Sequence, residues 1–527
     1  MTNPFCVAKR VCLIALTAAG CTDVTEAPTT LNYGLTLAPT GIDPHINASA
    51  ELGIPLTSVY DTLVVQDPHS GEVLPSLAES WTISPDGRSY TFSLRQGVRF
   101  HDGTTFDAED VVANLDYIVD PDNHSQKAVF MLGPFERAEV IDSRTVTLHL
   151  SQPFPPLLDS LAQVYLGMAS PEALEAWGPA EYQFHQVGTG PYRFVEYVPN
   201  DHLTLEVNPD YAWAPQIYQQ AGPYYDRIVF RFYEDPATRA LALENGEIDI
   251  MGEVPSHDVE RLVAPGQFLL QPVGIPGQPM QFLFNTARPP TDDPEVRRAL
   301  IEGVGRLGIV QTVFGKYSRV SEGPLAHGMW AFSGDAPFPD YDLGAAWQRL
   351  EQAGWVLAEP GRPRVRDGVP LSLVIVTPNW GNHPEVSQLL AADWERLGVE
   401  VRIETAPGFG LLREVRDRGE YNLIGINFFG TDPDVLRPMF ASDGLYNWMN
   451  VRDPELDALL SEAATTELSQ SERAALYAEA ARLIRDQSLI LPIRDYVDLV
   501  VVNDRVAGLR FNYQGWCPLL LDLRPGP

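Results

Sequence analysis

Cysteine is scarce in this sequence, with four residues in a chain of 527. Cys6 and Cys12 lie in a segment that we expect to be cleaved on export, and Cys21 is expected to carry a lipid. Cys517 would then be the only thiol that remains free in the mature chain, so no disulfide can form within it. We therefore expect packing alone to stabilise the folded protein.

The sequence has no apolar run of the roughly 20 residues that are needed to cross a bilayer. Residues 11–19 form a short apolar segment behind Lys9 and Arg10, which is typical of a bacterial export signal. Residues 18–21 (AAGC) are similar to a lipobox, although leucine is usual at the first of these positions. We predict a signal peptide over 1–20, acylation of Cys21 and a polar tether over 21–30; cleavage without lipid is the alternative.

Basic residues are few, because 37 Lys and Arg stand against 70 Asp and Glu. The formal net charge of −33 excludes nucleic acid as a partner, since a polyanion would be repelled. The acidic residues are spread along the chain without long runs, which is typical of a solvated surface. Attraction of a cationic ligand is the alternative interpretation of this charge.

Common catalytic signatures are also missing. The sequence contains no Gly-x-Ser-x-Gly, no His-Glu-x-x-His and no phosphate-binding Gly-x-x-x-x-Gly-Lys-Ser/Thr. None of the ten histidines has a second histidine three to five residues away, so a local two-histidine metal site is unsupported. We expect no enzyme, no cofactor and no metal site, although a triad assembled from distant residues stays open.

The length of 527 residues exceeds what a single core supports, so at least two lobes are expected. Alternating apolar positions predict strands near residues 90–94, 146–150, 203–207, 371–375 and 399–403. Asp293-Pro294 and Asp453-Pro454 predict helix starts, and a further helix is expected from Ser471 to Asp486. The sequence then returns to strand character over 490–502, which predicts two chain crossings between the lobes, and hence a hinge and a cleft.

One stretch of about forty residues resembles a known family. It reads PSLAESW (75–81), PDG (85–87), YTFSL (90–94), GVRFHDGT (97–104) and FDAEDV (106–111). In this order and spacing it is similar to the signature region of the family 5 extracellular solute-binding proteins, which serve oligopeptides, dipeptides and nickel. The likeness continues at GTGPY (188–192), NPDY (208–211), GEID (246–249), FN (284–285), DPEVRRAL (293–300), EQAGW (351–355), LGV (397–399) and LPI (491–493).

The resemblance implies an α/β protein with the type II periplasmic-binding-protein fold of cluster C, built from two hinged lobes and an inserted domain. The predicted borders are 31–62, 187–270 and 495–527 for lobe I, 63–186 for the inserted domain II, and 271–494 for lobe III. The ligand would lie between lobes I and III.

The resemblance also shows where this chain departs from peptide binders of the family. Those proteins hold the ligand's α-amino group with an aspartate shortly before an Asp-Pro or Glu-Pro step, often after a tryptophan. Here Phe429 stands at the aspartate position and Ile426 at the tryptophan position, and no carboxylate occurs between Glu420 and Asp432. A shifted alignment would make Asp432 the anchor, whereas the ring of Phe429 offers only a cation–π contact.

A second departure concerns the ligand's carboxylate, which dipeptide-type members clamp with an arginine. The equivalent loop over 377–384 (TPNWGNHP) has no arginine or lysine. Its amides and indole suit a neutral, hydrogen-bonding ligand, which predicts a peptide longer than a dipeptide or a non-peptide polar solute. The candidate ligand-binding residues are His45, Asn47, Ser49, Met280, Gln281, Phe282, Asn379, Trp380, Asn382, Asn427, Phe428, Phe429 and Asp432; for Trp380, Phe428 and Phe429 a place in the core is the alternative.

The resemblance implies that the chain is a monomeric, lipid-anchored protein in the periplasm or on the outer face of the cell membrane. It would capture a small peptide or similar polar solute and deliver it to the transmembrane subunits of an ABC permease. The alternatives are an oligosaccharide, opine, nickel or haem as ligand, a sensing role, and an extracellular hydrolase.

Overall fold

The computed structural model of the chain describes residues 29–36, 41–49, 51–220, 222–335, 337–359, 361–379, 381–406, 414, 417–465 and 468–526. The predicted signal peptide, Cys21, most of the predicted tether and Trp380 lie outside the described residues. Within the described ranges, no helix is both long and apolar enough to cross a membrane.

The first large sheet has seven strands drawn from distant parts of the chain. Their order is β12 (Phe268–Gly274), β20 (Val497–Asn503), β11 (Ile250–Met251), β1 (Thr30–Leu35), β10 (Arg227–Phe232), β9 (His202–Val207) and β8 (Tyr192–Val198). The central pairs β1–β10 and β1–β11 are parallel, whereas β20 joins antiparallel to β11 and β12. The late strand β20 thus lies in the same sheet as β1, the first described strand of the chain. This return agrees with the prediction from the sequence.

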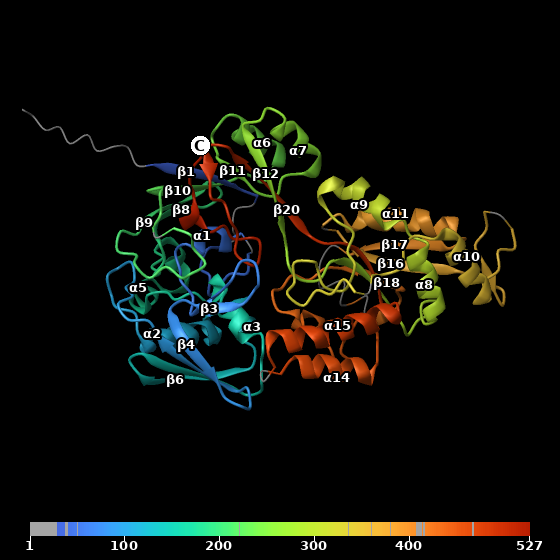
Figure 1. Ribbon diagram of the computed structural model, residues 1–527, viewed down its shortest axis with the longest axis horizontal. Helices are drawn as coiled ribbons and strands as arrows, with labels where there is room; N and C mark the ends of the chain where they lie inside the picture. The colour runs from blue at the N-terminus through green and yellow to red at the C-terminus, as the bar shows by residue number, and fades with distance from the viewer. Residues whose placement is uncertain are drawn as a thin grey trace, which may run out of the picture.

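The second large sheet has five strands and forms the other half of the molecule (Figure 1). Its order is β17 (Glu400–Ala406), β16 (Ser372–Pro378), β18 (Leu423–Ile426), β13 (Met280–Phe284) and β19 (Ile490–Arg494). The helices of the same half are α8 (Pro294–Glu302), α9 (Arg306–Phe314), α10 (Leu343–Gln352), α11 (His383–Arg396), α13 (Arg437–Phe440), α14 (Pro454–Ala463) and α15 (Gln470–Asp486).

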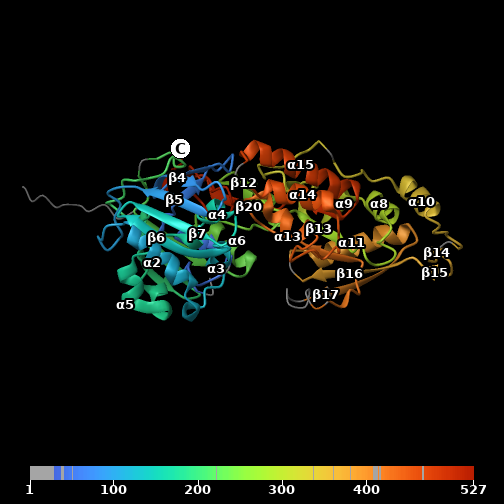
Figure 2. The same cartoon turned by 90° about the horizontal axis from the view of Figure 1, so that it is seen from below.

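Within the described residues the chain passes between these two sheets twice, once over residues 275–279 from β12 to β13 and once over residues 495–496 from β19 to β20. The view from below shows the two halves on either side of this junction (Figure 2). Because β12 pairs with β20 as far as Gly274, the first lobe extends beyond the predicted border at residue 270. The exact domain borders stay a prediction.

A third sheet of four strands lies in the segment predicted to be inserted, in the order β4 (Ala78–Ile83), β5 (Ser89–Leu94), β7 (Thr145–Leu150) and β6 (Phe135–Asp142). The remaining helices of the first half are α1 (Gly53–Leu56), α2 (Ala108–Val119), α3 (Ala128–Met131), α4 (Leu157–Ser160), α5 (Pro171–Glu181), α6 (Pro236–Glu244) and α7 (Ser256–Val263). The short two-stranded pairs are β2 (Val64–Gln66) with β3 (Val73–Pro75), β14 (Val365–Arg366) with β15 (Val369–Pro370), and β21 (Val506–Ala507) with β22 (Arg524–Pro525).

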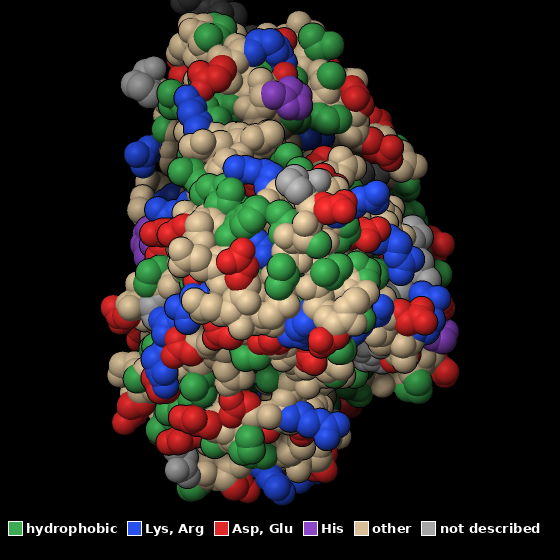
Figure 3. Space-filling view, turned by 90° about the vertical axis from the view of Figure 1, so that its right-hand side faces the viewer, with side chains coloured by type: hydrophobic (Ala, Val, Ile, Leu, Met, Phe, Trp, Pro, Cys, Tyr) green, Lys and Arg blue, Asp and Glu red, His purple; other side chains and the backbone are tan. Residues whose placement is uncertain are grey.

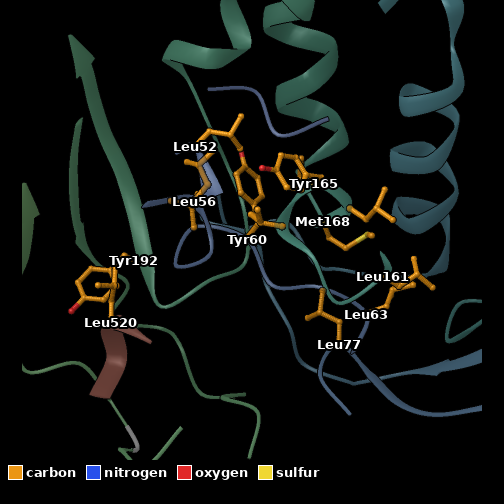
Figure 4. Packing of buried hydrophobic residues seen from close by; sticks show 14 of the residues in the cluster. Leu52, Leu56, Tyr60, Leu63, Leu77, Leu161, Tyr165, Met168, Tyr192 and Leu520 are labelled. Carbon is orange, nitrogen blue, oxygen red and sulfur yellow. The ribbon is translucent and has the colours of Figure 1, made fainter. Parts of the chain in front are cut away.

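The four-stranded segment and the first lobe share one hydrophobic core. Leu63, Leu77 and Leu161 from the predicted insert belong to the same buried cluster as Leu52 and Leu520 from the first lobe (Figure 4). The five-stranded half has a separate core, centred on β13, β16 and α11. A third, smaller buried cluster lies under α6 and α7 in the first half. Burial of apolar surface therefore joins the predicted insert to the first lobe and leaves the five-stranded half with a core of its own.

Helix starts follow the predicted caps, with one difference. The side chain of Asp293 accepts a hydrogen bond at the start of α8, and that of Asp453 does the same at the start of α14. The last long helix begins earlier than predicted, because Ser469 rather than Ser471 forms a capping box with Glu472.

The glycines of the GTGPY stretch allow two segments of backbone to approach closely. A Cβ atom on Gly188 would lie 2.1 Å from the carbonyl oxygen of Val59, and one on Gly190 would lie 2.4 Å from that of Ser58. The amide of Gly190 donates to the Val59 carbonyl at 2.9 Å. Absence of a side chain is therefore required here for contact with residues 58–59.

We expect Gly188→Ala to reduce the free energy of unfolding by about 1–3 kcal/mol, because backbone must move to admit the methyl group. Chemical denaturation followed by circular dichroism measures this change. Gly222→Ala is the matched control, since an added Cβ there meets no atom within 4 Å. Equal stabilities of the two variants would contradict the proposed close approach.

Candidate functional site

Two cavities of about 310 Å³ each lie between the two halves of the molecule. The first, here called the Lys127 cavity, is lined by Lys127 and Tyr165 from one half and by Phe429 and Thr431 from the other. The second, the Arg494 cavity, is lined by Glu253 and Asp498 from the first lobe and by Arg494 and Asn382 from the opposing lobe. Trp516 lines both cavities, so they are neighbours in one interlobe cleft.

The Lys127 cavity combines a cation with aromatic walls. The ammonium of Lys127 lies 3.7 Å from the centre of the Tyr165 ring. Partial burial lowers the pKa of Lys127 to about 8, because the charged form loses hydration. The amine therefore remains mostly protonated at neutral pH and offers a positive charge beside Gln163 and Thr431.

The Arg494 cavity contains charges of both signs. Arg494, the last residue of β19, is only 6% exposed, and its guanidinium lies 3.8 Å from the ring centre of Phe314 and 4.2 Å from that of Tyr496. On the side of the first lobe, the carboxylate of Asp498 accepts from the amide of Glu253 at 2.9 Å. Burial, followed by the charge of Glu253, raises the pKa of Asp498 to about 7.

Three rings meet where the two cavities adjoin. The ring centre of Phe429 lies 4.9 Å from that of Tyr496 and 5.8 Å from that of Trp516, both in edge-to-face contact. Tyr496 and Trp516 are 6.2 Å apart. Phe429 is nevertheless 44% exposed, so a large part of its ring is available to a ligand.

Direct contacts join the two halves across the cleft. The hydroxyl of Thr431 donates to the Asp159 carboxylate, which also accepts from the side-chain amide of Gln66 at 2.6 Å. The Tyr513 hydroxyl donates to the carbonyl oxygen of Gly328 at 3.0 Å and accepts from the amide of Trp330 at 2.9 Å. The structure therefore describes an arrangement in which the lobes touch.

Asp432, the alternative anchor for a ligand ammonium, is already paired. Its two carboxylate oxygens accept from the guanidinium of Arg473 at 2.8 and 3.0 Å, and one of them also caps the short helix at 433–436. Asp432 as a whole residue is 9% exposed. An ammonium that binds there would have to share this carboxylate with Arg473.

The other predicted ligand-binding residues are distributed between the cleft and the interior. Asn382 and Phe429 line the cavities, and Asn379 is exposed. Asn427 and Phe428 are half-buried, and the Phe428 ring lies 5.1 Å from that of Tyr446. As ligand-binding residues, all of these stay predictions.

The remaining candidates lie within the two bodies. Met280, Gln281 and Phe282 are fully buried in β13, where the amide of Gln281 donates to Gln278. His45 is fully buried with its Nε2 2.7 Å from the Gly167 carbonyl oxygen, while Asn47 and Ser49 are bonded to neighbouring residues of their own loop. Their role in ligand binding likewise stays a prediction.

Sequence reasoning missed Lys127, Arg494, Tyr496 and Trp516 as wall residues. Arg494 directly precedes the second crossing at 495–496 and Tyr496 belongs to it, and both line the Arg494 cavity. The crossing was predicted, so its flanking residues could have been selected on that ground. Nothing in the local sequence of Lys127 or Trp516 indicates that they reach the cleft.

Two lobes, two crossings and a cleft between them define the type II fold of periplasmic binding proteins, and comparison with solved structures confirms this prediction. The structure of NikA from Brucella suis in complex with Fe(III)-EDTA superposes with a TM-score of 0.81 at 25% sequence identity, covering 94% of this chain and 99% of that one.

The sequence model of the family described as bacterial extracellular solute-binding proteins, family 5 (middle), matches residues 72–449. The chain belongs to this family, and it is a solute-binding protein of the class that serves ABC importers. It is 31% identical over 435 residues to the glutathione-binding protein GsiB of Salmonella paratyphi A, with 79% of each chain covered. It is 29% identical to a probable di/tripeptide-binding protein of Pseudomonas aeruginosa, with 92% of this chain and 94% of the relative covered.

The contact between Thr431 and Asp159 predicts a pH dependence of stability. Burial, followed by the charge of Asp432, raises the pKa of Asp159 to about 7. The folded state therefore binds a proton more tightly than the unfolded state, so this contribution is complete below about pH 4 and is lost as the pH rises to about 7. The loss is at most roughly 4 kcal/mol, and is smaller because the side chain keeps some contact with water.

Asp159→Asn removes this titration, so the variant should gain stability relative to the wild type between pH 4.5 and pH 7.5. Denaturant unfolding of both proteins at the two pH values measures the change. Asp116→Asn, at an exposed position on α2, serves as the control. A difference between wild type and Asp159→Asn that is the same at both pH values would show the interpretation to be wrong.

Proposed function

We infer that the ligand is a short peptide or peptide-like polar solute, enclosed between the lobes and passed to the transmembrane subunits of an ABC permease. The observation that carries this proposal is the cleft itself: two adjoining cavities with aromatic walls, one cation in each, and two carboxylates in the second. Such a lining suits a ligand with several polar groups and fixed charges, rather than an apolar one.

The ligands in the names of the relatives belong to the same class of peptide-like solutes. GsiB is described as binding glutathione, and the Pseudomonas aeruginosa relative as binding di- and tripeptides. Each of these is a small molecule with amide groups, at least one carboxylate and an ammonium. The Lys127 and Arg494 cavities together offer partners for all three kinds of group.

The proposed mechanism is binding by closure, without chemistry on the ligand. Opening at residues 275–279 and 495–496 would separate Phe429 from Tyr496 and Trp516 and expose both cavities. A ligand that bridges the lobes stabilises the closed arrangement by its contacts with both, which shifts the population toward closure. We propose no catalytic residue and no cofactor.

The protein is further proposed to be a monomer outside the cytoplasm, attached to a membrane through a lipid on Cys21. Acylation would place the folded lobes behind a short tether next to the permease. Cys21→Ser should move the protein from the membrane fraction to the soluble extract of the host, as measured by fractionation and mass spectrometry of the N-terminal peptide. If the wild type and Cys21→Ser were attached to the membrane to the same extent, the proposed lipid anchor on Cys21 would be contradicted.

A panel of probes tests the ligand class. Dipeptides, tripeptides, tetrapeptides, glutathione, haemin and nickel with histidine are each added to the purified chain, and the melting temperature and calorimetric affinity are measured. We expect at least one peptide or glutathione to bind and to raise the melting temperature by mass action. Binding of haemin or nickel without any peptide would replace this proposal by one of the alternative ligands.

Trp516 supplies a test of the site. Trp516→Ala should weaken the best peptide of the panel by at least about 10-fold, because loss of a buried aromatic contact costs on the order of 1–3 kcal/mol. Trp177→Ala is the matched control, since this residue is 46% exposed on α5 and lines neither cavity. Unchanged affinity in Trp516→Ala would place the ligand elsewhere.

A further inference from the structure

Arg494 is a buried cation that forms no ion pair with a carboxylate in the described part of the chain, although the charge of Asp495 acts on it. Its guanidinium donates to the hydroxyl of Ser318 at 3.2 Å and also forms a hydrogen bond with the hydroxyl of Tyr496, whereas its Nε atom is buried without a hydrogen-bond partner. The neighbouring Asp495 bonds instead to the amide of His327 at 3.1 Å. Successive side chains of an extended segment point to opposite sides, which separates the two charges.

The rings beside Arg494 compensate only part of the cost of this burial. Phe314 and Tyr496 lie on the guanidinium at 3.8 and 4.2 Å, and each cation–π contact contributes about 0.5–2 kcal/mol. A buried cation costs several kcal/mol unless it is also paired and hydrogen-bonded. An unused donor on a planar guanidinium that lines a cavity is therefore suited to an incoming carboxylate, which it can bind through two parallel hydrogen bonds.

The same cavity contains an excess of negative charge on its other side. Glu253 is exposed, and Asp498 is 7% exposed with one oxygen bonded to the amide of Glu253. Neither carboxylate forms an ion pair within the described residues, although the guanidinium of Arg239 lies near both. The charges of Arg494, Glu253 and Asp498 all act on the hydroxyl of Tyr496, so charges of both signs lie near this group.

We propose that the Arg494 cavity receives a zwitterionic group of the ligand, with its carboxylate on Arg494 and its ammonium facing Glu253 and Asp498. This inference rests on the proposed function and narrows the ligand to peptides or peptide-like solutes with a free carboxylate and a free amine close together. The loop at 377–384 has no cation, and Asn382 from this loop lines the cavity in which Arg494 supplies one. The cation that the loop lacks, and that would pair with the ligand's carboxylate, is thus provided by Arg494 at the end of β19.

The test varies ligand and protein together. Di-, tri- and tetrapeptides are prepared as free acids, C-terminal amides and N-acetyl derivatives, and glutathione as its free acid, its amide at either carboxylate and its N-acetyl derivative. Calorimetry measures their affinities for the wild type and Arg494→Gln. For the wild type we expect the best free acid to bind about 10–100-fold more tightly than its blocked forms, as charge-assisted hydrogen bonds predict. For Arg494→Gln the gap between acid and amide should fall below about threefold, while the effect of acetylation persists.

Variants on the opposite wall give the reciprocal result. Glu253→Gln and Asp498→Asn, separately and together, should reduce the penalty for N-acetylation and leave the gap between acid and amide intact. Arg319→Gln is the matched control, because Arg319 is an exposed arginine close to the crossing that does not line the cavity. Melting temperatures of all variants separate loss of binding from loss of folding, and Arg494→Lys retains the charge if Arg494→Gln does not fold.

The outcomes distinguish the two proposals. Binding of peptide acids and amides with equal affinity by the wild type would overturn this inference and leave the proposed function intact. An acid preference that survives in Arg494→Gln would also overturn it, because the carboxylate would then bind elsewhere. Failure of every free acid in the series to bind the wild type would overturn the inference together with the proposed function.

Discussion

The backbone passes between the two halves at only two described places, and the rest of the structure depends on this constraint. At 275–279 and 495–496 the chain leaves one sheet and enters the other. Side chains at the second crossing, such as Arg494 and Tyr496, line the cavity between the lobes. In such a hinge, residues at a crossing also line the cleft. Opening of the lobes and contact with the ligand therefore involve the same few residues.

The charges in the cleft differ in kind from those on the surface. Over the face shown in Figure 3, acidic and basic side chains are interspersed, as solvated charges commonly are. In the cleft, by contrast, Arg494 is enclosed by rings, and Asp498 is buried beside Glu253. Water screens the surface charges but reaches the cleft poorly, so a few side chains there act on a ligand more strongly than the large net charge does.

Most of the fold could be predicted from the sequence, because strand alternation, caps and family motifs are local signals. The strands at 89–94, 145–150 and 202–207 and the caps at Asp293 and Asp453 illustrate this. The sequence predicts a border at residue 270, whereas the pairing of β12 with β20 continues to Gly274, which no local pattern indicates. Likewise, no local pattern indicates that the inserted segment shares its core with the first lobe.

The candidate site could be predicted in part. Phe429 and Asn382 were selected because the family places ligand contacts in their loops, and both line the cleft cavities. His45 and Phe282 were selected on the same basis, but both are fully buried within the lobes. Lys127 and Trp516 could not be selected, because their approach to Phe429 is a consequence of how distant segments pack.

The position of Trp516 in the chain has a consequence for biogenesis. Of the residues that line the two cavities, only Cys517 follows it, whereas the others span residues 53–514. A nascent polypeptide therefore lacks the shared wall of its pocket until nearly all of the other wall residues have been synthesised. The binding pocket is completed only when the last part of the chain packs against residues that precede it by several hundred positions.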